Sequence, residues 1–139
     1  MITSHFGPRN TGIPGASTSH PGLDFRARPG AEIMAPQNGT VIEIGPQNKG
    51  GNAVFVSNDD GSMNGFAHTQ GADGLKVGDK VTEGQVIGKS DGSGTKQPHL
   101  HFTYRPGTET TPAQKTDKAV DPLRTQFKDK PKSETCVSC

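Results

Sequence analysis

Short apolar runs separated by glycine-rich turns set the pattern through the middle of the chain. Alternation and β-branched content predict strands at residues 33–35, 40–44, 52–57, 63–68 and 98–104. Asn38-Gly39 and the stretch 58–61 carry the residues that tight turns between strands prefer. In segment 75–88, glycines punctuate short apolar pairs, which is typical of small strands joined by turns. The pattern therefore predicts an all-β domain.

The two ends of the chain differ from this middle part. Residues 4–30 are rich in Gly, Pro, Ser and Thr and are predicted to form irregular loops. Segment 91–95 is predicted to be a mobile loop, and residues 120–123 are expected to dock against the body. We expect one domain over residues 1–125 and a flexible polar tail over residues 126–139.

Composition and charge narrow the possible functions. Only 28% of the residues are hydrophobic and none is Trp, so the core must be thin. The net charge is +1 and the basic residues form no dense patch, which argues against a nucleic-acid partner. No apolar run is long enough to span a membrane.

Two further features of the termini carry expectations. The first residues lack the basic and apolar regions of a secretory signal, which indicates either a mature or excised domain or another route out of the producing cell. Cys136 and Cys139 both lie in the last four residues, without a second ligand pair for zinc, and we assign them no function.

Histidines provide the main chemical signal of the chain. Of the five, four lie in three short segments, and only His5 stands apart as an expected surface residue. His99 and His101 are two apart on a predicted strand, so their side chains face the same way. His20 and Asp24 flank Pro-Gly, a turn signal that can bring residues four apart together. His68 ends another predicted strand.

These residues have the composition of a hydrolytic zinc site. A catalytic zinc ion typically has three protein ligands and an open position for water. His20, Asp24 and one of His99 or His101 would supply that number. Two histidines then remain, one to accept a proton and one to hydrogen-bond the oxyanion of a scissile carbonyl.

The chain resembles the lysostaphin-type, or LytM-like, zinc endopeptidases of peptidoglycan over roughly residues 4–123. The motifs that carry this resemblance are Ser4-His5-Phe6-Gly7-Pro8-Arg9, His20-Pro21-Gly22-Leu23-Asp24-Phe25, Ile33-Met34-Ala35-Pro36, Asn38-Gly39-Thr40-Val41, Phe66-Ala67-His68, Val77-Gly78-Asp79-Lys80-Val81, Gly84-Gln85-Val86-Ile87-Gly88, Pro98-His99-Leu100-His101-Phe102 and Val120-Asp121-Pro122.

The resemblance implies a site and a fold. It implies that His20, Asp24 and His101 bind one Zn²⁺ per chain, and that His68 and His99 form the catalytic pair. It also implies a compact antiparallel β-sheet or sandwich with groove-forming loops, and hydrolysis of peptide cross-links of bacterial peptidoglycan by a metal-activated water. Arg9 is similar to a family residue beside the site. The chain departs from the family at Phe66, where Tyr is frequent, and in the short segment between Arg9 and His20.

Two other functions compete with this hypothesis. Some LytM-like domains have lost ligands and act as wall-binding or hydrolase-activating modules, but here all five site positions are present. Residues 77–87 also resemble the hammerhead motif of lipoyl and biotinyl carrier domains. The lysine that such a domain modifies has only one candidate context, Asp117-Lys118-Ala119, which lies well past the last predicted strand.

Several consequences of the peptidase hypothesis stay open at the level of sequence. The bond could be a D-Ala–meso-diaminopimelate cross-link or a glycine bridge, and either His68 or His99 could be the base. The enzyme would act on the cell wall, in the periplasm or outside the cell, after release as a phage endolysin or delivery by a secretion system. A delivered toxin would imply an immunity protein as partner. A monomer is expected.

Overall fold

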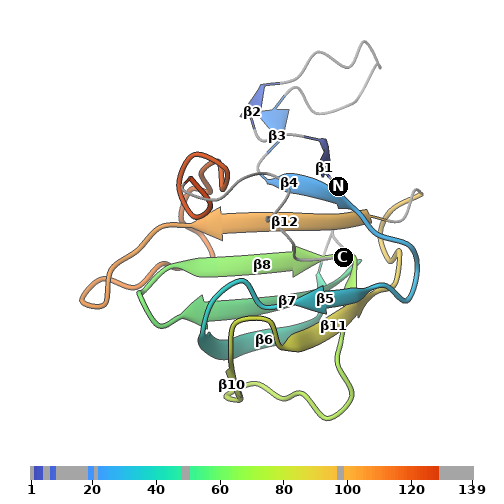
Figure 1. The fold of residues 1–139 in the computed structure, drawn as a ribbon, viewed down its shortest axis with the longest axis horizontal. Coiled ribbons are helices and arrows are strands. Elements are labelled where there is room, and N and C mark those ends of the chain that lie inside the picture. The colour runs from blue at the N-terminus through green and yellow to red at the C-terminus, as the bar shows by residue number, and fades with distance from the viewer. Residues whose placement is uncertain are drawn as a thin grey trace.

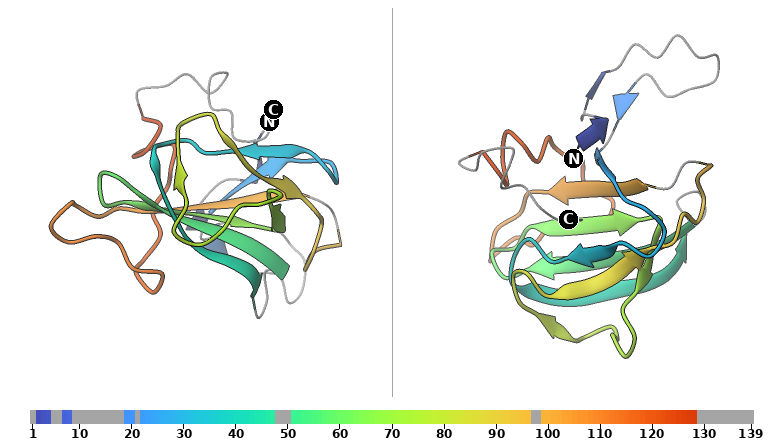
Figure 2. Two further views of the ribbon diagram at one scale, coloured as in Figure 1. Left: turned by 90° about the horizontal axis from the view of Figure 1, so that it is seen from below. Right: turned by 45° about the vertical axis from the view of Figure 1, so that its right-hand side comes forward.

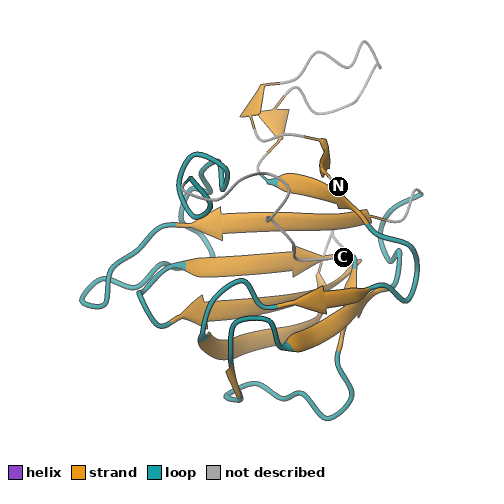
Figure 3. Ribbon diagram, viewed as in Figure 1, coloured by secondary structure: helices purple, strands orange, loops and turns teal. Residues whose placement is uncertain are grey.

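A computed structural model of the chain describes residues 2–4, 7–8, 19–20, 22–47, 51–96 and 99–128; for residues 3–4, 7–8, 19–20 and 26 it describes only the backbone. All the regular secondary structure in these ranges consists of β-strands (Figures 1 and 3). All strand pairs within them are antiparallel. The prediction of an all-β, antiparallel fold is confirmed.

A seven-stranded sheet forms the body of the molecule. Its strands, in order across the sheet, are β1 (Ile2–Ser4), β4 (Leu23–Arg26), β12 (His99–Arg105), β8 (Met63–Ala67), β7 (Gly51–Asn58), β6 (Gly39–Gln47) and β10 (Lys80–Val81). Strands β6, β7 and β8 follow each other as hairpins, whereas β12 enters between β8 and β4. The last long strand is thus flanked by segments far from it in the sequence.

A smaller sheet covers one face of the large one (Figure 2). It consists of β5 (Glu32–Met34), β11 (Val86–Ser90) and β9 (Thr69–Gly71). A separate pair, β2 (Gly7–Pro8) with β3 (Ser19–His20), carries the first predicted metal ligand on its second strand.

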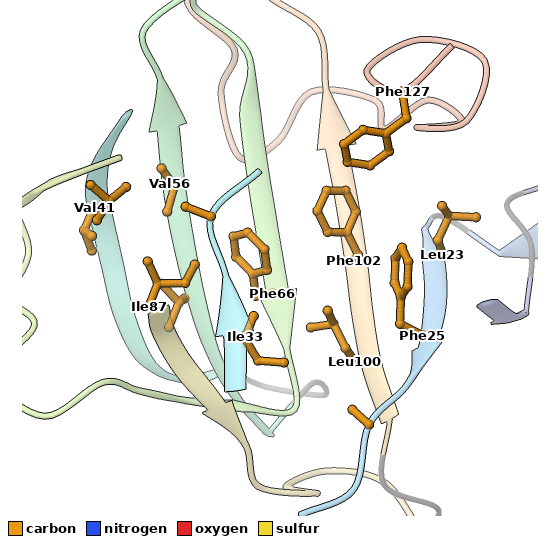
Figure 4. Packing of buried hydrophobic residues seen from close by; sticks show 14 residues of the cluster. Leu23, Phe25, Ile33, Val41, Val56, Phe66, Ile87, Leu100, Phe102 and Phe127 are labelled. Carbon is orange, nitrogen blue, oxygen red and sulfur yellow. The ribbon is translucent and has the colours of Figure 1, made fainter. Parts of the chain in front are cut away.

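The core fills the space between the two sheets (Figure 4). Ile33 and Ile87 enter it from the small sheet, and neither is exposed to solvent. From the large sheet, Phe66 and Phe102 meet edge to face with ring centroids 5.4 Å apart. Side chains alternate between the two faces along a strand. The residues next to these buried core residues therefore point to the opposite face of the large sheet. We call that opposite face the outer face.

One expectation for the first part of the chain requires correction. Residues 4–30 are not wholly irregular, since β4 lies within them and pairs with both β1 and β12. Near the other end of the described chain, Phe127 is 5% exposed and its ring centroid lies 5.7 Å from that of Phe102, while the domain boundary at residue 125 stays a prediction. Residues 129–139, which include both cysteines, lie outside the described residues, so the flexible tail stays a prediction.

Two further segments agree with their sequence patterns. As expected, residues 120–123 dock on the body, where the Val120 amide donates a hydrogen bond to the Tyr104 carbonyl over 2.9 Å. Residues 75–88 contain the short strands β10 and the start of β11, joined by turns. The described part of the chain has no helix that could span a membrane.

Replacing Phe102 should destabilise the protein strongly. Its side chain is fully buried and contacts the rings of Phe25, Phe66 and Phe127, so Phe102→Ala is expected to lower the free energy of unfolding by about 3–5 kcal/mol. Urea denaturation measures this value. Val77→Ala is the control, because Val77 is 62% exposed and its truncation should cost less than about 0.5 kcal/mol. Equal effects for the two variants would contradict the assigned core.

Candidate active site

The pairing of β4 with β12 places three of the predicted site residues on the outer face. Asp24 lies directly opposite His101 in the ladder, and His99 lies opposite Arg26. The alternate residues Leu23 and Leu100 point into the core with no exposure. The sequence prediction that His99 and His101 share one face, opposite to Leu100, is confirmed.

The Asp24 carboxylate is the centre of this group. Its Oδ1 atom lies 2.9 Å from Nδ1 of His101 and 3.5 Å from Nε2 of His99. All three side chains are partly buried, with 13% exposure for the Asp24 side chain and about 20% for the two imidazoles. An imidazole nitrogen of His101 and a carboxylate oxygen of Asp24 therefore lie close together although the two residues are 77 positions apart in the chain.

His68 joins this group from the other side of β12. It follows directly after β8, and its ring centroid lies 4.6 Å from that of His99 and 6.4 Å from that of His101. Its backbone has a positive φ of 58°, which is uncommon for a residue with a side chain. Such a conformation persists only where the surroundings enforce it, and it is found most often at functional sites.

Loop 91–95 supplies those surroundings. The Asp91 amide donates to the His68 carbonyl over 3.0 Å, and the Ser93 carbonyl lies 2.6 Å from Nδ1 of His68. Since a carbonyl only accepts, Nδ1 of His68 must carry the proton of this hydrogen bond. The neutral ring then presents Nε2 as its proton acceptor.

The same loop is fixed by two of its own side chains and by one from β7. The Asp91 carboxylate accepts hydrogen bonds from the amide and the hydroxyl of Ser93, at 2.8 and 2.6 Å. It also accepts one from the Asn52 side chain at 2.8 Å, and the Asn52 amide donates to the Ser93 hydroxyl at 2.7 Å. Asp91, Ser93 and Asn52 thus form a clasp that holds the Ser93 carbonyl against His68, in a loop that the sequence predicts to be mobile.

Two titrating groups of this region have altered pKa values. Burial lowers the pKa of His68, and the hydrogen bond to Ser93 opposes this effect without cancelling it. Burial acts to raise the pKa of Asp91, but the hydrogen bonds from Asn52 and Ser93 outweigh it and lower that pKa. The lowered pKa of His68 favours a neutral imidazole at neutral pH, and the lowered pKa of Asp91 favours an ionised carboxylate in the clasp.

The predicted ligand His20 is placed only through its backbone. It belongs to β3, where it pairs with Gly7, and its side chain lies outside what is described. Gly22, two residues before Asp24, lies close against β12: a Cβ at this position would collide with the Phe102 carbonyl and lie 3.0 Å from Nε2 of His101. Glycine in the His-Pro-Gly-Leu-Asp segment therefore permits this close approach.

The described donors suit a zinc ion, although they do not complete a site. Imidazole nitrogen and carboxylate oxygen are both common Zn²⁺ ligands, and the pair of Asp24 and His101 is close enough to reach one ion. Within the described ranges, no group of three or more His, Cys, Asp or Glu side chains forms a metal-binding cluster. The third ligand would have to come from a side chain such as that of His20.

A hollow of about 180 Å³ extends from His101 along the outer face. Gly65, Ala67 and Ala53 contribute little side-chain volume to its lining, and Phe55 and Arg105 border it further along the sheet. A Cβ at Gly65 would lie 2.5 Å from the Thr103 hydroxyl and 2.9 Å from the Phe55 ring, so glycine keeps this floor open. This hollow is a depression in the large sheet, lined by residues of β6, β7, β8 and β12, whereas the family resemblance implies a groove formed by loops, which stays a prediction.

The sequence located the histidines of the site but did not predict the loop residues that hold His68. Asp91 and Ser93 have the i, i+2 spacing of an Asx-turn, which was a usable signal for an ordered loop. The role of Ser93, however, is played by a backbone carbonyl, which any residue could provide. Arg9 and His5 lie outside the described residues.

A match to a family model and several relatives agree with this geometry. The model described as Peptidase family M23 matches residues 18–122. The chain is 36% identical over 99 residues to "Glycyl-glycine endopeptidase ALE-1" of Staphylococcus capitis, which covers 70% of this chain and 27% of that protein. It is 30% identical over 105 residues to "Peptidoglycan DD-endopeptidase ShyC" of Vibrio cholerae, covering 74% of this chain and 24% of that protein.

Solved structures agree as well. The catalytic domain of lysostaphin from Staphylococcus simulans superposes with a TM-score of 0.74 at 31% identity, covering 89% of this chain and 90% of that one. The chain spans only about a quarter of the length of the two relatives named above. The match also contains residues 77–87, so the stretch that resembles a carrier-domain hammerhead lies inside the matched region. With a family model over most of its length, and a lysostaphin-like fold, the chain belongs to peptidase family M23.

Proposed function

We propose that this chain is a zinc metalloendopeptidase that hydrolyses peptide cross-links of bacterial peptidoglycan. Its family and its relatives support a peptidoglycan hydrolase. The observation that carries the proposal is the convergence of Asp24, His68, His99 and His101 at one end of a groove. Its site of action would be the bacterial cell wall.

His20, Asp24 and His101 are the residues that would hold zinc. Asp24 contributes a carboxylate and so lowers the net charge of the site, while the β4–β12 ladder fixes it opposite His101. Zinc bound there would lower the pKa of a coordinated water to about 7 and would polarise the peptide carbonyl.

His68 has the features of a general base. Its Nδ1 proton is directed at the Ser93 carbonyl, so Nε2 of the neutral ring is the atom able to accept a proton. Burial lowers its pKa, which keeps the ring neutral at pH 7. His99 lies between His68 and Asp24 and would hydrogen-bond the oxyanion on the scissile carbonyl.

The groove would hold the peptide in an extended form. It runs from His101 past Thr103 towards Arg105, which are alternate residues of β12 on the outer face. An extended peptide lying along this depression would place one of its carbonyls beside His101. The adjacent residues of the peptide would then lie over the small side chains of the floor.

Substituting the metal ligands should give a different phenotype from substituting the catalytic pair. Asp24→Ala and His101→Ala are expected to lose both zinc and activity, since each removes a ligand. His68→Ala and His99→Ala are expected to retain zinc, while kcat falls by about 10²–10⁴-fold. Zinc content after dialysis and dye release from labelled peptidoglycan measure the two properties.

The matched control for the carboxylate is Asp73→Ala, because Asp73 is exposed on a turn away from the strands of the site. It should leave zinc content and dye release unchanged. If His99→Ala retained full activity on cell walls, or if the wild type bound zinc without cleaving any wall, the catalytic assignment would be wrong. The second result would favour a wall-binding or hydrolase-activating module.

The clasp should set the tautomer of His68. Asp91→Ala removes the acceptor that holds Ser93, so the Ser93 carbonyl is expected to release Nδ1 and kcat to fall roughly 10-fold with little change in KM. Nitrogen-15 spectra of the imidazoles should show proton density shifting from Nδ1 to Nε2 of His68. Asp91→Asn keeps one carbonyl oxygen for Ser93 and should restore part of the wild-type signal.

Asp59→Ala serves as the control for this experiment, since Asp59 is an exposed aspartate in the turn after β7. It should change neither the His68 spectrum nor kcat. An unaltered His68 tautomer in Asp91→Ala would show that the clasp has no positioning role.

A further inference from the structure

Arg105 occupies the end of the groove away from the predicted zinc ligands. It is the last residue of β12 and is partly buried on the outer face. Its Nε donates to the Asp117 carbonyl over 2.8 Å, and its Nη1 contacts the Thr103 hydroxyl over 3.3 Å. The second contact directs the guanidinium back along the strand towards His101.

No carboxylate among the described residues forms an ion pair with Arg105. The nearest candidate, the Asp117 carboxylate, accepts a hydrogen bond from the Gln114 amide over 2.7 Å instead. Burial lowers the pKa of the Arg105 guanidinium, although the group stays charged. The negative charge of Asp117 offsets part of this effect, but the hydrogen-bond partners of the guanidinium are neutral groups. A substrate carboxylate could therefore form the charge-assisted hydrogen bond that the guanidinium lacks.

The other cation near the groove is already neutralised. Lys115 donates to the Glu43 carboxylate over 2.7 Å and to the Gln47 side-chain oxygen over 2.8 Å, and its ammonium lies 4.7 Å from the centre of the Phe55 ring. Its charge is therefore balanced within the protein. Of these two side chains, only Arg105 lines the hollow without forming an ion pair to a described carboxylate.

The position of the guanidinium sets its distance from the reaction. Residues two apart on a strand are separated by roughly 7 Å, so a head group beside Thr103 lies about that far from His101 along the groove. An extended peptide advances roughly 3.3–3.6 Å per residue. A group bound by Arg105 would thus belong to a residue about two positions from the scissile bond.

We propose that Arg105 binds a free carboxylate of the substrate, about two residues from the scissile bond, and so selects acidic cross-links. This inference rests on the proposed peptidoglycan endopeptidase function and specifies its substrate class. Directly cross-linked stem peptides carry free carboxylates on D-glutamate and meso-diaminopimelate, whereas the residues of a glycine bridge carry none. The full chain should therefore prefer directly cross-linked walls.

Matched synthetic substrates test this preference in the zinc-loaded protein. One is a cross-linked stem-peptide dimer with free carboxylates, the second is the same dimer with those carboxylates amidated, and the third is pentaglycine. The wild type is expected to cleave the free acid about 10–100-fold better in kcat/KM than the amide, as a charge-assisted hydrogen bond allows. The difference should lie mainly in KM.

Substitutions then assign the preference to one residue. Arg105→Gln should remove the discrimination between acid and amide, and Arg105→Lys should retain part of it. Lys115→Gln removes the same charge from the neighbouring loop and should keep the wild-type preference. Urea unfolding of each variant verifies that the fold is intact.

A binding measurement keeps the inference testable apart from turnover. In zinc-free protein, the Arg105 Nε–H signal should shift on titration with a free-acid stem peptide and not with its amide. Equal cleavage of acid and amide by the wild type, or an acid preference that survives Arg105→Gln, would overturn the role of Arg105. If the wild type cleaved none of the three substrates and no intact wall, the proposed function itself would fail, while a selective Arg105 shift would still support the carboxylate site.

Discussion

The register between β4 and β12 is the constraint on which the site depends. It sets Asp24 opposite His101 and Phe25 opposite Leu100. Because strand side chains alternate, a slip of one residue would turn Leu100 and Phe102 outward and bury His99 and His101. The fully buried side chains of Leu23, Leu100 and Phe102 make such a slip very unfavourable. Hydrophobic packing on one face therefore determines the geometry of the polar group on the other.

The remaining parts of the site are attached to this ladder through β8. That strand pairs with β12 on the side away from β4, and it delivers His68 at its end. The positive φ of His68 turns the chain there, and the Asp91–Ser93–Asn52 clasp holds the ring in one tautomer. The outer face of β12 then continues as a groove to Arg105, so one strand carries a predicted zinc ligand, part of the groove floor and the inferred carboxylate receptor.

The sequence was sufficient for features that depend on local pattern. The strands containing Val41, Val54, Phe66 and Phe102 were predictable from alternation, as was the shared face of His99 and His101. Strand β4 was not predictable in the same way, since its four residues lie in a Gly- and Pro-rich region and become a strand through pairing with β12. The clasp of His68 could not be predicted, because it uses the backbone carbonyl of Ser93. The environment of Arg105 could not be predicted either, because it depends on burial and on a loop 12 residues further along the chain.

Anomalous X-ray diffraction at the zinc edge, on crystals of the full chain grown with zinc, tests the central claim most directly. The β4–β12 register predicts a single strong peak per chain, within bonding distance of the Asp24 carboxylate and of Nδ1 of His101, with the His20 imidazole as the third protein ligand. A well-ordered crystal with no peak between Asp24 and His101, or with zinc held elsewhere, would contradict the assignment of this cluster as a metallopeptidase centre.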